Sequence, residues 1–273
     1  MNDAVIALGF ALFIWWFSTG IVILLNRMSR SAVALSLVLS SLVGAAALLG
    51  LAHTAQQSSM TGAYCAFTCA LLAWGWNELS FLTGWITGPR TTDLPRGTRG
   101  WLRFVESLRA VLWHELAISV VGVAILVVTW DAPNQVGTGT YLVLWIMRTS
   151  AKLNLFFGVR NLNEAFLPEH LAYLESFFRR RPMNAFFPFS VSVASCFLLM
   201  LVNFASSPAA NSVQVVGATL VGTLLALAIV EHLMLVLPLD TTSLWRWAIR
   251  KRQSTGAHAS VHASEPTSNL KKA

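Results

Sequence analysis

AVIALGFALFIWWFSTGIVILLNRMSR, residues 4–30, contains the pattern that recurs through the whole chain. Residues 4–25 carry no charged side chain, and Arg27 and Arg30 follow them closely. A helix needs about 20 apolar residues to cross about 30 Å of hydrocarbon, so this stretch is long enough to span a bilayer. Because backbone N–H groups in lipid must be satisfied within the segment, we predict that the span is helical.

The same kind of apolar stretch occurs seven times along the chain. The predicted spans are residues 4–25, 32–52, 62–87, 111–129, 139–159, 187–204 and 213–237. The chain is 55% hydrophobic and 11% charged, with a mean hydropathy of +0.62. A soluble domain of this length would need far more charge on its surface. We therefore predict an all-α polytopic membrane protein, a bundle of seven transmembrane helices.

The 19 Lys and Arg residues indicate the orientation of these spans. All but two lie in the first, third and fifth gaps between spans or in the C-terminal segment. The N-terminus and the other gaps contain none. Short cytoplasmic loops retain basic residues whereas translocated loops lack them, so we predict an outside N-terminus and a cytoplasmic C-terminus.

The net charge of +7 and the pI near 9.9 raise the question of nucleic-acid binding. The excess charge is spread over the loops of one predicted membrane face, where anionic lipid headgroups account for it. We therefore predict membrane lipid as a partner and no nucleic acid. We also expect a single membrane domain at residues 1–252. Residues 253–273 are small and polar, which predicts a disordered cytoplasmic tail.

An amphipathic pattern lies between the fifth and sixth predicted spans. Apolar residues recur there at helical spacing and are followed by three consecutive arginines. These residues are Leu167, Leu171, Leu174, Phe178, Arg179, Arg180 and Arg181. An apolar face with a basic end is typical of a helix that lies in the membrane interface with its arginines on lipid phosphates. We predict a cytoplasmic interfacial helix that anchors the chain to lipid, and a docking surface for a partner is the alternative.

Ionisable side chains also occur inside the predicted spans. Such groups cost several kcal/mol in hydrocarbon unless they are paired, which makes them candidates for function. Counted from the cytoplasmic ends of their spans at 1.5 Å per residue, they fall within roughly one to two turns of a common level. They are Glu78, His114, Glu115, Arg148, Lys152, Glu231 and His232. We call this set the polar layer.

Three interpretations of the polar layer remain open. Its charges could form ion pairs that set the helix register without any ligand. Imidazole nitrogen and carboxylate oxygen could instead hold a metal ion or the magnesium of a tetrapyrrole. The candidate ligands are His114, Glu115, Glu231 and His232. They form two adjacent pairs, and adjacent residues point about 100° apart on a helix, so they lack the Glu-x-x-His signature. A proton or ion pathway is the third interpretation.

Several stretches resemble one known family as whole strings. The strings are AFTCALLAWGWNELSFLTGWITGPR (66–90), APNQVGTGTYLVLWIMRTSAKLNLFFGVRN (132–161), LNEAFLPEHLAYLESFFRRRPMN (162–184) and EHLMLVLPL (231–239). They resemble the photosynthetic complex assembly protein 2 family (PuhE) of purple phototrophic bacteria, over residues 10–250. The resemblance implies a role in building or stabilising the reaction centre and its light-harvesting antenna. It supplies no catalytic residues.

On this basis we predict a non-enzymatic assembly factor in the cell inner membrane or the photosynthetic intracytoplasmic membrane. Its expected partners are reaction-centre and light-harvesting subunits, with bacteriochlorophyll delivery as a linked role. The alternative is a metal- or tetrapyrrole-binding membrane enzyme of pigment metabolism. No cofactor is assigned, and bacteriochlorophyll or a metal is the candidate. A transporter using Glu78, Arg148 and Lys152 is less favoured, because the sequence shows neither repeats nor interrupted helix pairs.

Overall fold

The structure is a computed structural model that describes residues 2–26, 28–162 and 167–237. The described chain is helical: α1 (Asn2–Asn26), α2 (Arg30–Ala55), α3 (Met60–Leu82), α4 (Gly100–Val128), α5 (Val136–Phe157), η2 (Glu169–Phe177), α6 (Phe186–Ala205) and α7 (Ser212–Met234). Its β pairing within these residues is one isolated bridge between Val159 and Arg180. The predicted tail, residues 253–273, and the predicted domain end at 252 lie outside the described residues.

Five helices are long and apolar enough to cross a membrane: α1, α2, α4, α6 and α7. The chain is therefore a helical, multi-pass membrane protein by the length and composition of these segments. The helices α3 and α5 are not among the five, although they are 23 and 22 residues long. These two helices are less apolar than the other five, since α5 carries Arg148 and Lys152 and α3 contains Asn77 and Glu78.

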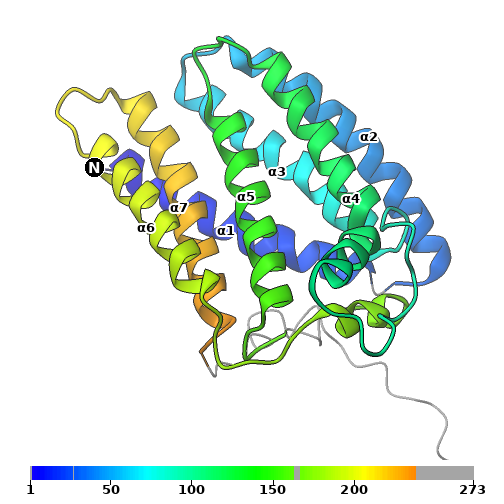
Figure 1. Cartoon of the computed structure of the whole chain (residues 1–273). Helices are drawn as coiled ribbons and strands as arrows, with labels where there is room; N and C mark the ends of the chain where they lie inside the picture. The colour runs from blue at the N-terminus through cyan, green and yellow to red at the C-terminus, as the bar shows by residue number, and fades with distance from the viewer. Residues whose placement is uncertain (1, 27, 163–166, 238–273) are drawn as a thin grey trace, which may run out of the picture.

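The positions of α3 and α5 explain this composition. The helix α3 packs against α1, α2, α4, α5 and α7, whereas α5 packs against α3, α4, α6 and α7 (Figure 1). Phe67 and Leu71 of α3, for example, are buried with Ala7 of α1 and Leu220 of α7. Because each of these two helices packs against at least four others, it can carry polar groups that pair with protein and that a wholly lipid-facing helix would have to avoid.

The segment predicted as an interfacial helix forms the 3-10 helix η2. A 3-10 helix has three residues per turn, so Leu171, Leu174 and Phe177 share one face. That face is buried against Phe81 of α3 and Ala110 of α4, and Leu167 and Phe178 pack on the same cluster. The structure therefore places this apolar face in the protein core rather than on lipid. It does so because the C-terminal end of α3 and the first half of α4 cover the segment.

Candidate functional site: the polar layer

The two cations of α5 are each paired with a carboxylate from a different neighbouring helix. Arg148 Nη2 donates to Glu78 Oε2 of α3 at 2.9 Å, and Lys152 Nζ donates to Glu115 Oε1 of α4 at 2.5 Å. Arg148 and Lys152 are four residues apart and therefore lie on one face of α5. The polar layer thus connects α5 to α3 and α4 through two ion pairs, one helical turn apart.

The Lys152–Glu115 pair is largely enclosed, with side chains 23% and 21% exposed, whereas in the other pair Glu78 is 14% and Arg148 is 40% exposed. An ion pair in such surroundings is costly to break, because removing one partner leaves an uncompensated charge away from water. The two pairs join α5 to α3 and to α4, one oxygen of each carboxylate being bound to a cation of α5.

His232 has both ring nitrogens engaged. Nδ1 lies 2.8 Å from the Ala228 carbonyl oxygen, and Nε2 lies 2.9 Å from Ser150 Oγ. A carbonyl oxygen can only accept, so Nδ1 donates to Ala228, and in the neutral form of the ring Nε2 accepts from the serine hydroxyl. This histidine connects α7 to α5, and protein engages both of its ring nitrogens.

His114 is fully buried and is stacked on an aromatic ring. Its ring centroid lies 4.4 Å from that of Phe81, with 29° between the planes. Its backbone N–H donates to the Thr87 carbonyl oxygen at 2.9 Å. Within the described residues neither ring nitrogen has a hydrogen-bond partner. His114 therefore lies between α3 and α4 with its hydrogen-bonding capacity unused by protein.

Glu231 has different contacts from those of the two histidines. Its side chain is exposed, it shares a side-chain hydrogen bond with Trp15 of α1, and the charge of Arg148 attracts it. The four candidate metal ligands consequently have four separate environments. Within residues 2–26, 28–162 and 167–237, no three His, Cys, Asp or Glu side chains are placed to hold one metal ion. The donor groups present do not fit a metal centre.

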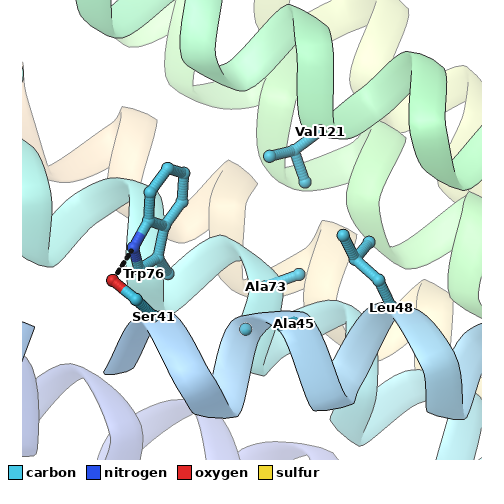
Figure 2. A pocket seen from close by; sticks show the side chains of 7 residues that line it. Ser41, Ala45, Leu48, Ala73, Trp76 and Val121 are labelled. Carbon is cyan, nitrogen blue, oxygen red and sulfur yellow. Dashed lines mark hydrogen bonds between the residues drawn. The ribbon is translucent and has the colours of Figure 1, made fainter. Parts of the chain in front are cut away.

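Two cavities open on the surface of the bundle. Figure 2 shows the first, a groove of about 200 Å³ between α2, α3 and α4, in which Trp76 Nε1 donates to Ser41 Oγ at 3.0 Å. Its other lining residues are Gly44, Ala45, Leu48, Ala73 and Val121. The second, of about 430 Å³, lies along α5 and is also lined by Phe186 of α6. Neither of these two cavities has a histidine in its wall, so neither offers an imidazole as axial ligand to a tetrapyrrole.

Two hydrogen-bond networks lie in the interior; the sequence predicted that Asn77 and Asn154 face protein, but it did not single out their partners Tyr141 and Asn184. Asn77 Nδ2 donates to Tyr141 Oη at 3.1 Å, and that hydroxyl donates to the Ile118 carbonyl oxygen at 2.9 Å, which joins α3, α5 and α4. Asn184 Nδ2 donates to Asn154 Oδ1 at 3.1 Å at the start of α6. A Tyr or Asn within or beside an apolar stretch could have predicted these bonds, because a buried polar group needs a hydrogen-bond partner.

The three arginines after η2 lie beside the end of α5. The Arg179 N–H donates to the Leu155 carbonyl at 3.1 Å, and the Arg181 N–H donates to the Val159 carbonyl at 3.0 Å. This backbone pairing leaves the side chains of Arg180 and Arg181 exposed. They are therefore the part of the predicted lipid or partner surface that remains on the outside of the protein.

Comparison with known proteins places this bundle in a family. A family model described as "Protein of unknown function (DUF3623)" matches residues 1–256. The chain belongs to the DUF3623 family. A Rhodobacter capsulatus protein described as "Uncharacterized 30.4 kDa protein in puhA 5'region" is 35% identical over 253 residues, 91% of this chain and 92% of the relative. No solved structure matches the chain. The DUF3623 match includes every helix described above and so contains the whole polar layer.

Proposed function

We propose that the protein is a multi-pass assembly factor for the photosynthetic reaction centre–light-harvesting complex. The observation that carries this proposal is the relative in the puhA 5' region of a photosynthetic bacterium. The resemblance of residues 10–250 to the photosynthetic complex assembly protein 2 family (PuhE) points to the same process. In this proposal the partners are reaction-centre and light-harvesting subunits, in the cell inner membrane or the photosynthetic intracytoplasmic membrane.

The polar layer supports a scaffold rather than an enzyme. Arg148 pairs with Glu78, Lys152 pairs with Glu115, and His232 is held by Ser150 and Ala228. Catalytic acids and bases need access to a substrate, and these groups face other helices instead. Bacteriochlorophyll delivery would then be linked to assembly through partner contacts, since neither cavity presents a histidine to a pigment.

The proposal includes seven crossings, with α3 and α5 as enclosed spans and the N-terminus outside. Their lengths support this, because 22 or 23 residues of helix rise about 33 Å, enough for the hydrocarbon core. The distribution of Lys and Arg supports the orientation.

A pair of reporter fusions tests this topology. Alkaline phosphatase fused after Gln57, between α2 and α3, is expected to be active because that loop faces outward. The same reporter fused after Arg96, between α3 and α4, is expected to be inactive and serves as the matched control. Activity at Arg96 without activity at Gln57 would reverse the orientation, and equal activity would remove the crossing by α3.

Deleting the gene in its native host tests the assembly role. We expect the assembled reaction-centre–antenna complex to fall severalfold, measured by membrane absorbance, because its subunits would lack the factor that stabilises intermediates. Pools of bacteriochlorophyll precursors, measured by chromatography, are expected to stay unchanged. Complementation with the wild-type gene is the control. Accumulation of one particular precursor would favour the enzyme of pigment metabolism instead.

A further inference from the structure

Three buried side chains of α3 and α4 have polar atoms without a hydrogen-bond partner among the described residues. Asn77 and Ser80 are each 1% exposed, and His114 is 0% exposed. Within the described residues, Asn77 Oδ1, Ser80 Oγ and both ring nitrogens of His114 are buried without a hydrogen bond. Buried polar atoms are nearly always paired with protein or ordered water, since each unpaired one costs about 1–3 kcal/mol. Three such groups on two facing helices therefore require a common explanation.

Two sets of contacts join α3 and α4 near these atoms, about one helical turn apart. At one level Tyr141 connects Asn77 of α3 to the Ile118 carbonyl of α4, through bonds of 3.1 and 2.9 Å. At the other level the Phe81 ring stacks on His114 at 4.4 Å. The two levels are four residues apart on each helix, which is about 6 Å of rise. Asn77 and Ser80 are neighbours on the surface of α3 by their spacing, and Phe81, the next residue, stacks on His114, so the unpartnered groups lie within about one turn of one another along the bundle.

The chemistry of this segment selects a small neutral ligand. No organic ligand can reach side chains that are at most 1% exposed. A single imidazole with an amide and a hydroxyl is also a poor donor set for a transition metal. Water matches the groups, because it supplies donors and acceptors to an amide oxygen, a hydroxyl and a neutral imidazole with one of each. A buried water typically makes about three hydrogen bonds, which these side chains can provide.

We propose that ordered water binds between α3 and α4 and bridges His114, Ser80 and Asn77. This site is next to the ion pairs, where Glu78 Oε1 and Arg148 Nε are also buried without partners. The polar layer is then hydrated at its centre, and the water satisfies groups that protein alone does not.

X-ray radiolytic footprinting of the purified full-length protein in detergent tests the site. Radicals formed from bound water oxidise adjacent side chains even when bulk solvent cannot reach them. We expect Phe81 and His114 to be oxidised at least severalfold faster than Phe67. Phe67 is the matched control, because it lies on the same helix, is 0% exposed and belongs to a wholly apolar cluster. Equal rates at Phe81 and Phe67 would overturn the proposal.

Two variants provide an independent readout. Ser80→Ala and His114→Phe each remove one ligand of the water, and either change is expected to lower the oxidation rate of Phe81 severalfold. Their effects on the melting temperature should be non-additive in the double variant, because both act on one shared water. Strictly additive shifts, with Phe81 oxidation as in the wild type, would mean that the two side chains have no common ligand.

Discussion

Lys152→Met is expected to lower the free energy of unfolding by about 3 kcal/mol, as removal of one member of a buried ion pair does. Methionine retains the length of the side chain but leaves the Glu115 carboxylate without the ammonium group now 2.5 Å away. Glu115 is only 21% exposed, so water cannot replace the lost partner fully. Reversible unfolding in mixed micelles, followed by circular dichroism, measures the loss.

The double variant Lys152→Met/Glu115→Gln separates the pair from its surroundings. Replacing both members of a buried pair with neutral groups is often close to neutral, so we expect this variant to recover most of the stability. Arg109→Met is the matched control, because Arg109 is 53% exposed where it pairs with Glu106 and such pairs contribute about 0–1 kcal/mol. An equal loss in Arg109→Met and Lys152→Met would show that the intramembrane pair has no special role.

The sequence predicted the common level of these charges but not their pairing. Counting residues from the ends of the spans placed Glu78, Glu115 and Lys152 near one depth, and the structure brings Glu115 to Lys152 and Glu78 to Arg148. Helical spacing shows that Arg148 and Lys152 share a face of α5. It cannot show which neighbouring helix meets that face, because this depends on how each helix is rotated in the bundle.

Hydropathy identifies helices that face lipid more readily than helices that face protein. A lipid-facing helix such as α6 must be apolar along most of its surface, so its composition alone reveals it. The helices α3 and α5 face protein, and their polar residues are matched by groups far away in sequence, such as Ile118 for Tyr141. The amphipathic pattern of Leu171 and Leu174 was visible too, but lipid and the protein core select the same apolar face.

Arg103 is a further residue whose role depends on contacts distant in sequence. Its side chain lies in the first turns of α4, and the residue is only 4% exposed. The guanidinium donates to the Phe156 carbonyl at 2.9 Å and to the Phe177 carbonyl at 2.5 Å. It also lies 3.9 Å from the Phe156 ring centroid, within cation–π range. One side chain thus satisfies carbonyls at the C-terminal ends of both α5 and η2, which have no partner within their own helices.

Arg103→Met is therefore expected to cost about 3 kcal/mol, since it leaves two buried carbonyls without a donor. Hydrogen exchange should rise in η2 and at the end of α5, while the α1–α3–α7 core around Phe67 keeps its protection. Arg103→Lys retains the charge but not the planar fork, so an intermediate loss is expected. Arg99→Met is the control, because Arg99 is exposed four residues earlier. An equal rise in the hydrogen exchange of η2 in Arg99→Met and Arg103→Met would contradict this role. Positive charge near the start of α4, and not the two hydrogen bonds to carbonyls, would then hold η2 on the bundle.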